Sequence, residues 1–429
     1  MHSVMCFFWV CPDHTMKTHT SLMRSRKIPG EMNDENESRP VVLVLTDYFD
    51  PGFRAGGAPR SAANLIESLG NEYSFRVVTR DRDLGVSHPY DGIVPGRWRQ
   101  LHQAKVLYLS PAELGITTLR RVLNATPYDV LYLNSFFSPR FTIAPLLLRR
   151  LGLIPARPTV LAPRGELEPA RLLLKRTKKA LYLSVAKRLG LLSDVLWHAS
   201  TLTEADYFQR AIGPEIDIAV AIDLPTRPGQ DEEQPSRYPK SEGALSVAFV
   251  SRVSREKNLD VALKLVAAVE GCVEFHIYGP HVDAAYWAEC ESLIRALPPN
   301  IHVHDHGGVP PKVIASALQR HHVLLLPTRG ENYGHVVLEA LVAGCLPLIS
   351  DQTRWRDLEA LGVGWDISLS CPSEFQSALQ RCIDMAANPL ALMSASARRY
   401  GAAFAANEEA QVENRALLET ALKYGKDSE

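Results

Sequence analysis

The fold is decided by the stretch Leu326-Pro-Thr-Arg-Gly-Glu-Asn-Tyr-Gly-His-Val-Val-Leu-Glu-Ala-Leu-Val-Ala-Gly-Cys-Leu-Pro-Leu-Ile-Ser350. The apolar run Val323–Leu326 leads into it and is typical of a buried parallel strand. After a polar loop, the apolar periodicity of Val336–Ala343 predicts a helix that Gly344 ends. A second apolar run, Cys345–Ile349, predicts the next strand. We therefore expect a strand–loop–helix–strand unit of an α/β fold.

Two carboxylates belong to this unit: Glu331 in the loop and Glu339 on the helix. Free amides at a helix N-terminus attract anions, and phosphate is a frequent ligand there. A carboxylate on such a helix can accept hydrogen bonds from both hydroxyls of a ribose beside it. The pattern predicts a nucleotide-sugar pocket, whose donor-binding residues here are Glu339, Tyr333, Gly334, His335 and Val336.

The extended pattern allows a family to be named. Glu331-x7-Glu339, with Gly334 and the continuation Glu-Ala-Leu-x-Ala-Gly-x-x-Pro, resembles the signature of retaining glycosyltransferases of family 4, which have the GT-B fold. The strand and turn around Arg164 look like those of bacterial members that make surface polysaccharides. The resemblance spans residues 41 to about 400. It implies an α/β protein with two Rossmann-like domains facing across a cleft, and a last helix that crosses back to the first domain.

Composition fits this interpretation and excludes other classes. The chain has 429 residues, 46% of them hydrophobic and 22% charged, and a formal charge of −1, so no general attraction to nucleic acid is expected. The seven cysteines are scattered and mostly lie in apolar runs, as in a reducing cytosol. No stretch reaches the 18 or so apolar residues needed to span a bilayer. We expect a cytoplasmic protein, with contact at the inner face of the plasma membrane left open.

The chain divides into five predicted parts. Residues 1–39 are expected to be a disordered extension, and 40–223 a Rossmann-like acceptor domain. Residues 224–243, rich in Pro, Gln, Asp, Glu and Ser, are predicted to be the linker. Residues 244–400 are expected to form the Rossmann-like nucleotide-sugar domain, and 401–429 a helix that packs back on the first domain.

The first domain opens with a glycine-rich turn. Val41–Thr46 predicts a buried strand and Ser61–Leu69 a helix, with Gly56 and Gly57 in the loop between them. Glycines there let backbone amides approach a phosphate or a sugar closely. No Gly-x-Gly-x-x-Gly occurs, which argues against a Rossmann dehydrogenase. The resemblance implies that this loop borders the donor sugar and the acceptor; a plain tight turn is the alternative.

Two polar residues of the first domain are candidates for the acceptor or the sugar. Asn134 follows a predicted strand at its carboxyl end, where such sheets place ligands, and Arg164 follows another strand. Many family members carry a His around Asn134. A hydrogen bond from Asn134 to a sugar hydroxyl is expected in its place.

A basic segment suggests a partner. Residues 149–188 contain 11 Lys or Arg and only two Glu. On a continuous helix, Arg171, Lys175, Lys178 and Lys179 would share one face. Such a face would suit an anionic membrane or a lipid-diphosphate acceptor. A solvated basic helix is the equal alternative.

The segment after the linker supplies a candidate phosphate site. Arg252 and Lys257 follow a predicted strand in a loop. Arginine can bind two phosphate oxygens at once, while lysine acts as a point charge. The resemblance implies that this pair neutralises the leaving nucleoside diphosphate, with Arg255 as a nearby competitor. It also implies that the turn at Gly279 flanks the nucleotide base.

No divalent metal is expected to be required. Asp81 and Asp83 mimic the metal-binding Asp-x-Asp of a different glycosyltransferase fold, but this fold does not need such a motif there. His302, His304 and His306 alternate along a predicted strand. No fourth ligand is evident from the sequence, so these histidines are expected to be structural.

The predicted reaction moves a sugar from a nucleoside diphosphate to an acceptor hydroxyl with retention of anomeric configuration. The catalytic candidates are Glu331 at the donor sugar and Arg252 and Lys257 at the diphosphate. The acceptor is expected to be a glycan or a lipid-linked saccharide in lipopolysaccharide or exopolysaccharide assembly. The alternatives are a GT-B nucleotide-sugar epimerase or hydrolase, and a non-catalytic GT-B-like binding module, which the Asn at position 134 would suit.

Overall fold

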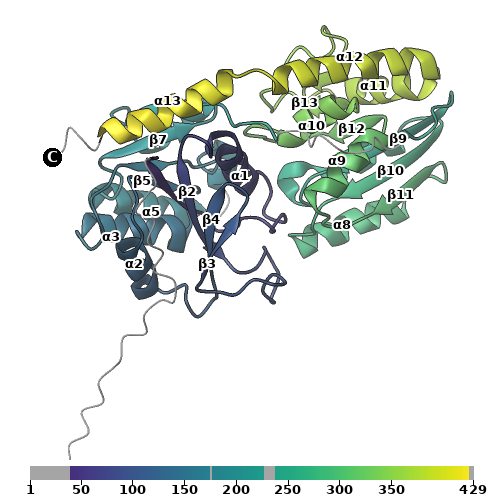
Figure 1. Cartoon of the computed structure of the whole chain (residues 1–429). Helices are drawn as coiled ribbons and strands as arrows, with labels where there is room; N and C mark the ends of the chain where they lie inside the picture. Colours follow the sequence, from purple (N-terminus) through teal and green to yellow (C-terminus); the bar gives the residue numbers. More distant parts are fainter. Residues whose placement is uncertain (1–38, 174–175, 227–236, 425–429) are drawn as a thin grey trace, which may run out of the picture.

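The computed structural model describes residues 39–173, 176–226 and 237–424. Residues 1–38 of the predicted N-terminal extension, Lys175 and the middle of the predicted linker lie outside these residues. Figure 1 shows two α/β bodies side by side, and the C-terminal helices run from the second body back over the first. None of the described helices is both long and apolar enough to cross a bilayer.

The first body is built on an eight-stranded sheet with the order β3-β4-β2-β1-β5-β6-β7-β8. Its pairs are parallel except for the β3–β4 hairpin at one edge. The strands are β1 Val41–Leu45, β2 Ser74–Arg80, β3 Trp98–Leu101, β4 Ala104–Leu109, β5 Val130–Leu133, β6 Thr159–Leu161, β7 Val195–Ala199 and β8 Ile218–Val220. The helices are α1 Gly57–Leu69, α2 Ile116–Ala125, α3 Ala144–Arg150, α4 Pro169–Leu173, α5 Arg176–Arg188 and α6 Leu202–Ile212, with a π-helical turn at Pro139–Ile143.

The second body carries a fully parallel six-stranded sheet with the order β11-β10-β9-β12-β13-β14. Its strands are β9 Ala244–Val250, β10 Cys272–Tyr278, β11 Ile301–Asp305, β12 Val323–Leu326, β13 Leu346–Ser350 and β14 Trp365–Ile367. Its helices are α7 Leu259–Ala267, α8 Ala284–Arg295, α9 Pro311–Arg320, α10 His335–Ala343, α11 Pro372–Asp384 and α12 Ala387–Ala405, with a 3-10 turn at Arg255–Lys257. The quoted stretch thus forms the predicted unit β12–loop–α10–β13.

Continuous apolar runs become the central strands because helices cover both faces of each sheet. β1 has no polar residue, and Val42–Leu45 are fully buried. β12 is likewise buried along its whole length. Parallel strands covered on both faces need apolar side chains in both directions, which explains the absence of alternation. Their carboxyl ends point toward the space between the two bodies, where loops meet.

The last helix, α13 Glu409–Tyr424, returns to the first body, and Figure 1 shows it in yellow along the top of that body. Arg415 Nη2 lies 2.7 Å from Glu72 Oε1, and the Asn414 amide donates to the carbonyl of Ile222 at 2.7 Å. Leu418 is fully buried in the core of the first body. The predicted crossing of the C-terminal helix is confirmed.

Leu418→Ala is expected to lower the free energy of unfolding by about 2–5 kcal/mol, because removing a buried Leu loses apolar burial and leaves a cavity. Val412→Ala on the same helix is the matched control, since the Val412 side chain is 56% exposed and should change stability by less than about 0.5 kcal/mol. Denaturant unfolding followed by circular dichroism measures both. Equal stability of the two variants would contradict the packing of α13 on the first body.

Candidate active site

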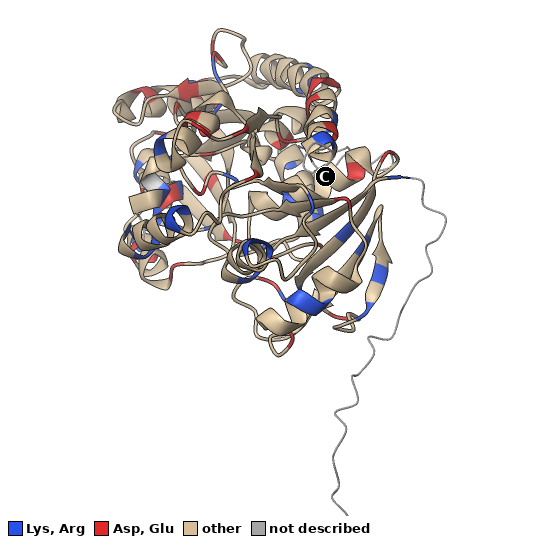
Figure 2. Cartoon of the chain, turned by 90° about the vertical axis from the view of Figure 1, so that its left-hand side faces the viewer, with Lys and Arg blue, Asp and Glu red and all other residues tan. Residues whose placement is uncertain are grey.

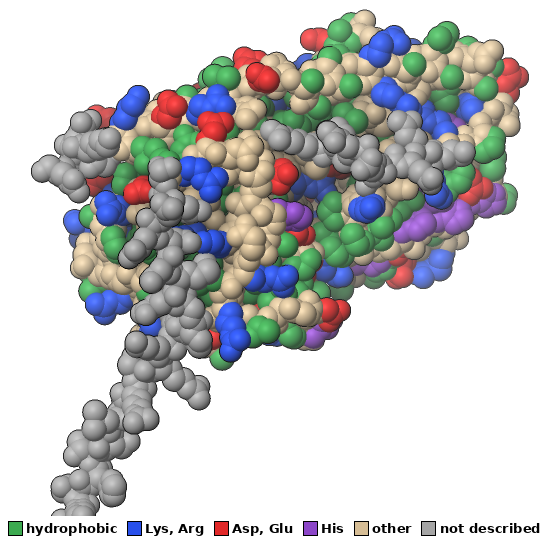
Figure 3. Space-filling view, viewed as in Figure 1, with side chains coloured by type: hydrophobic (Ala, Val, Ile, Leu, Met, Phe, Trp, Pro, Cys, Tyr) green, Lys and Arg blue, Asp and Glu red, His purple; other side chains and the backbone are tan. Residues whose placement is uncertain are grey.

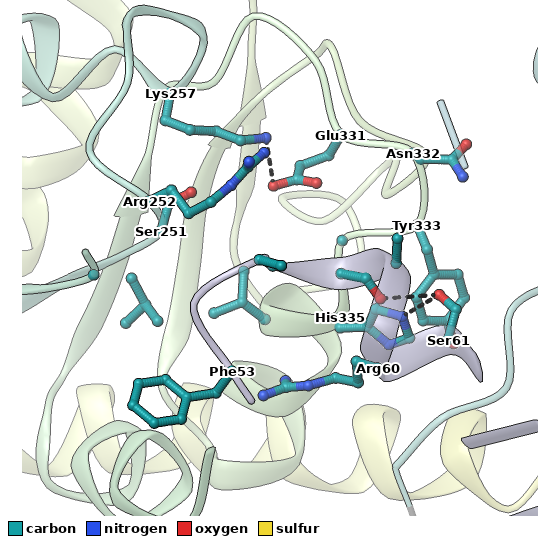
Figure 4. A pocket seen from close by; sticks show the side chains of 18 of the residues that line it. Phe53, Arg60, Ser61, Ser251, Arg252, Lys257, Glu331, Asn332, Tyr333 and His335 are labelled. Carbon is teal, nitrogen blue, oxygen red and sulfur yellow. Dashed lines mark hydrogen bonds and ion pairs between the residues drawn. The ribbon is translucent and has the colours of Figure 1, made fainter. Parts of the chain in front are cut away.

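A pocket of about 290 Å³ lies between the two bodies, at the carboxyl ends of both sheets. Loops from both bodies form its walls, as Figure 4 shows. Every predicted site residue except Asn134 lines it: Gly56, Gly57, Arg164, Arg252, Lys257, Gly279, Glu331, Tyr333, Gly334, His335, Val336 and Glu339. The structure therefore gathers segments that are up to about 280 residues apart in sequence.

Lys257 and Glu331 form an ion pair in the wall of the pocket. Lys257 ends a 3-10 turn after β9, and its side chain is only 3% exposed. Its ammonium donates to Glu331 Oε1 at 2.8 Å and to the carbonyl of Gly330 at 2.8 Å. Both bonds fix the loop that carries Glu331, so the carboxylate is held at a defined place in the pocket (Figure 4).

Arg252 also lines the pocket but forms no ion pair within the part of the chain that the structure describes. Figure 4 shows its side chain extending toward Glu331, yet it makes no hydrogen bond or ion pair with any residue that the structure describes. Burial lowers the pKa of this guanidinium and the charge of Arg171 lowers it further, while the charges of Glu256 and Glu331 offset the lowering only in part. A partly buried cation without a partner is unfavourable unless a ligand supplies the negative charge. Arg252 is thus the clearest sign of an anion site.

Arg255, the other arginine that the sequence offered for the phosphate site, points away from the pocket. Its side chain is 57% exposed, and Nη1 donates to Glu289 at 2.9 Å. It does not line the pocket. Arg252 is the arginine of this loop that faces the site.

The N-terminus of α10 faces the same pocket. Gly334 caps the helix with φ 76°, a left-handed conformation that glycine adopts without strain. A Cβ at this position would come within 3.2 Å of Trp355 Nε1. The first amides of a helix have no partner within the helix, and those of His335 and Val336 have none elsewhere among the described residues. These amides, with the helix dipole, add to the positive field around Arg252.

The glycine-rich turn of the first body lines the side of the pocket that faces Arg252 and the start of α10. Helix α1 begins at Gly57, four residues before the predicted Ser61, because Gly56 turns the chain at φ 87°. A Cβ on Gly56 would lie 3.2 Å from Arg252 Nε, and one on Gly57 would lie 3.7 Å from the His335 ring. The two glycines therefore let the first body approach the cation and the helix end of the second.

Gly279, in the turn after β10, allows the backbone of Ser251 and Arg252 to lie where it does. Its amide donates to the carbonyl of Gly307 at 2.7 Å. A Cβ on Gly279 would lie 1.7 Å from the carbonyl oxygen of Ser251, which no rotation of a side chain can relieve. The turn after β10 can therefore carry only glycine if the Ser251–Arg252 backbone is to stay where it is.

Gly279→Ala is expected to weaken binding of a nucleoside diphosphate by about tenfold or more, because the new methyl group displaces the backbone of Arg252. Isothermal titration calorimetry measures the affinity. Gly307→Ala is the control, since nothing lies within 4 Å of its Cβ position, although its φ of 62° makes that variant mildly strained too. Unchanged affinity in Gly279→Ala would mean that Arg252 does not contribute to the anion site.

Arg60 was not predicted, although it lies only three residues after Gly57. It forms an ion pair with Glu339 across the two bodies, with side-chain exposures of 23% and 19%. The carboxylate expected to bind a ribose thus has a protein partner. A ligand that binds Glu339 must therefore either share this carboxylate with Arg60 or displace Arg60 from it.

A buried polar network supports the pocket floor. Ser61 donates to Asp223 Oδ2 at 2.7 Å and lies 3.1 Å from His335 Nε2. Burial raises the pKa of the Asp223 carboxyl, but the ion pair with Arg164, together with the hydrogen bond from Ser61 and the neighbouring histidines, holds the pKa below the usual value. Burial lowers the pKa of His335 to about 4, so this ring is neutral at pH 7. Asp223 was not predicted, because its partners lie 59 to 162 residues away in sequence.

Asn134 lies beneath the pocket rather than in it. The side chain is 2% exposed; its amide nitrogen donates to the carbonyl of Ala58 at 2.9 Å, and its oxygen accepts from Arg164 Nε at 2.9 Å. The expected contact of Asn134 with a sugar hydroxyl is therefore wrong for this geometry. Asn134 positions Arg164 instead.

The basic residues of the segment do not all share one surface. Arg171 on α4 turns into the pocket, where it lies 2.7 Å from Glu256 across the two bodies. Lys179 donates to the carbonyl of Arg171 at 2.7 Å, and Lys178 is exposed. In Figure 2 the basic residues are spread over several elements. The prediction that Arg171 belongs to a surface face is wrong, because opposite charges in the cleft attract it inward.

Asp81 and Asp83 have structural partners. Asp83 Oδ2 accepts from the amides of Phe53 and Arg54 at 2.8 and 3.1 Å, and Asp81 pairs with Arg82. These bonds tie down the loop before Gly56, so the two carboxylates do not face a common open site.

Comparisons with known proteins can now be set against this geometry. Residues 230–384 match the family model described as glycosyl transferases group 1. No curated protein sequence matches the chain. Among solved structures, Anabaena HepE in complex with UDP and glucose is similar at 15% identity and a TM-score of 0.62, over 89% of this chain and 99% of HepE.

Two further structures show the same arrangement. Sucrose-phosphate synthase from Thermosynechococcus elongatus has 17% identity and a TM-score of 0.60, over 90% of this chain and 98% of the synthase. WaaG, a glycosyltransferase involved in lipopolysaccharide biosynthesis, has 14% identity and a TM-score of 0.59, over 88% of this chain and 98% of WaaG. At these identities the likeness establishes the fold. The chain has the GT-B fold, as predicted.

Proposed function

We propose that this protein transfers a sugar from a nucleoside diphosphate to an acceptor hydroxyl, with retention of anomeric configuration. One observation carries the proposal: the unpaired guanidinium of Arg252 faces the free amides at the start of α10, in a pocket that also holds Glu331. The match of residues 230–384 to glycosyl transferases group 1 supports it, since these residues include the second-body side of the pocket. HepE, whose structure holds UDP and glucose, supports it through the shared fold.

The reaction needs stabilisation of the departing diphosphate. The anomeric C–O bond to the β-phosphate breaks, the acceptor oxygen bonds to the anomeric carbon on the same face, and the acceptor proton passes to the leaving phosphate. Arg252, Lys257 and the amides of His335 and Val336 stabilise the charge that develops on the phosphate. A well-placed donor of this kind typically contributes about 3 kcal/mol to transition-state stabilisation.

The two carboxylates have separate proposed roles. Glu339 binds the ribose hydroxyls once Arg60 releases it, and the freed Arg60 can turn to the phosphates. Glu331, held by Lys257, fixes a hydroxyl of the donor sugar or stabilises its cationic carbon. Because protein cations and a helix end neutralise the diphosphate in this scheme, turnover is expected to continue in EDTA.

The proposed setting is the assembly of a bacterial surface polysaccharide on the cytoplasmic side of the membrane, with a glycan or lipid-linked acceptor. The shared fold with WaaG, which is involved in lipopolysaccharide biosynthesis, supports this setting. Contact with an anionic membrane would use exposed residues of α5 such as Lys178 rather than Arg171.

The test is incubation with UDP-, GDP- and ADP-sugars and a panel of saccharide and lipid-linked acceptors, followed by mass spectrometry and proton NMR. The proposal expects one donor to give a glycosylated acceptor with the anomeric configuration of the donor, in EDTA as well as without it. Free sugar or an epimerised donor without acceptor transfer would instead identify a hydrolase or epimerase. Binding without any turnover would identify a non-catalytic module.

A further inference from the structure

The outer edge of the second sheet carries a cluster of histidines apart from the pocket. β10 and β11 pair in parallel, with Glu274 opposite His302 and His276 opposite His304. Because alternate residues of a strand share a face, these four side chains project from one side of the sheet. Figure 3 shows a band of His side chains at the right of the molecule, where Figure 1 places β10 and β11.

Three ligand-bearing side chains of this cluster converge. Glu274, His276 and His304 each offer one potential ligand atom, and these three atoms lie within 4.8 Å of one another. His304 Nε2 is 2.7 Å from Glu274 Oε2, and His276 Nδ1 is 3.0 Å from His306 Nε2. The sequence alone showed the histidines of β11 without a further ligand; the structure supplies Glu274 and His276 from the neighbouring strand.

The geometry points to a divalent transition-metal site, and we propose that Glu274, His276 and His304 bind zinc on this edge of the sheet. Zinc takes His nitrogens and carboxylate oxygens at about 2.0–2.2 Å in tetrahedral geometry, so neighbouring ligand atoms lie roughly 3.4 Å apart. The side chains of His304 and Glu274 are 47% and 44% exposed, which leaves them room to adjust around an ion. His306 or water can take the fourth position.

The types of ligand atom in this cluster indicate which class of metal would bind. Two or three imidazoles with one carboxylate suit zinc, copper or nickel, whereas calcium and magnesium prefer oxygen ligands throughout. None of Glu274, His276 and His304 lines the pocket. The site is therefore structural or regulatory, and the proposal places no metal at the reacting atoms.

A bound ion would hold β10 to the edge strand next to the active site. The turn that follows His306 leads to Gly307, whose carbonyl accepts from the Gly279 amide, and to Val309, which lines the pocket. A ligand that binds only the folded state raises its stability. We therefore expect zinc to raise the melting temperature of the full-length protein.

The test uses the full chain, purified without a polyhistidine tag and stripped with EDTA, then titrated with ZnCl₂ by calorimetry and thermal shift. The wild type is expected to bind at this site and to melt at a higher temperature with zinc. His304→Ala and His276→Ala should each lose at least about tenfold in affinity, since even loss of an outer partner of a metal ligand typically costs that much. His88→Ala, a change at an exposed His far away in sequence, should behave as the wild type.

A second arm separates the neighbouring group Cys272, Glu274 and His302, which shares one carboxylate. Co²⁺ replaces zinc and gives a near-ultraviolet charge-transfer band only when a thiolate binds. The proposal expects no such band, and wild-type zinc affinity in Cys272→Ser. Full affinity in His304→Ala, or loss of affinity in Cys272→Ser alone, would overturn it. The comparison between variants also removes any contribution from the Cys and His within residues 1–38.

Discussion

Arg252→Ala is expected to weaken binding of the correct nucleoside diphosphate by about 100-fold and to lower kcat/KM by at least that factor. Removal of one charge-stabilising donor typically costs about 10²–10³ in rate. The effect should be large because Arg252 lines the pocket and forms no hydrogen bond or ion pair with a described residue, so its donors are free to bind the ligand. The folded state should not be destabilised, since the variant removes a partly buried cation without breaking an ion pair.

Arg255→Ala is the matched control for that experiment. It removes the same kind of side chain three residues away, where the guanidinium is 57% exposed and bound to Glu289. An exposed ion pair contributes little, so affinity and kcat/KM should stay near wild-type values. If the two variants behave alike, the assignment of Arg252 to the diphosphate is wrong.

Glu331→Gln is the second change with a large expected effect. The amide keeps the size of the side chain but removes the charge that would stabilise a cationic anomeric carbon, so kcat should fall by at least about 100-fold. Affinity for the free nucleoside diphosphate should change only a few-fold, because Glu331 is proposed to face the sugar. Steady-state kinetics combined with calorimetry on the diphosphate separates the two quantities.

Glu339→Gln provides the contrast to Glu331→Gln. This residue is proposed to hold the ribose, so its loss should weaken binding of both the diphosphate and the donor while affecting kcat less. Wild-type turnover in Glu331→Gln would contradict the proposed mechanism. An identical pattern in the two variants would contradict the separate roles of the two carboxylates.

The fold could be predicted because the patterns that indicate each strand and helix lie within short stretches of the sequence. The apolar runs Val41–Thr46 and Val323–Leu326 cannot be exposed, and each is followed by a turn and an amphipathic helix. Arg252, Lys257, Glu331 and Glu339 were found for the same reason, since each lies just after such a strand or on the next helix. The positions of ligand-facing loops in parallel sheets follow from topology alone.

The missed residues depend on contacts between the two bodies. Arg60 meets Glu339 279 residues further on, and Arg171 meets Glu256. No local pattern shows that these side chains face each other. The error about Arg171 has a specific cause: the helical periodicity of its own segment does not show Glu256, which attracts the Arg171 side chain from the second body.

The network around Asp223 illustrates the same limit in the interior. Asp223 follows a short strand just before the linker and looks like an ordinary surface acid in sequence. In the structure it is 4% exposed, because Arg164 and Ser61 supply its hydrogen bonds. A buried carboxylate is stable only with such partners, and the partners become visible only when the sheet is assembled.

The measurement that tests the central claim most directly is calorimetric binding of UDP, GDP and ADP to the wild type and to Arg252→Ala, both in EDTA. We predict that one of these diphosphates binds the wild type and that Arg252→Ala binds it about 100-fold more weakly. Equal affinity of the two proteins, or no binding of any of the three to the wild type, would contradict a nucleoside-diphosphate site between Arg252 and the start of α10.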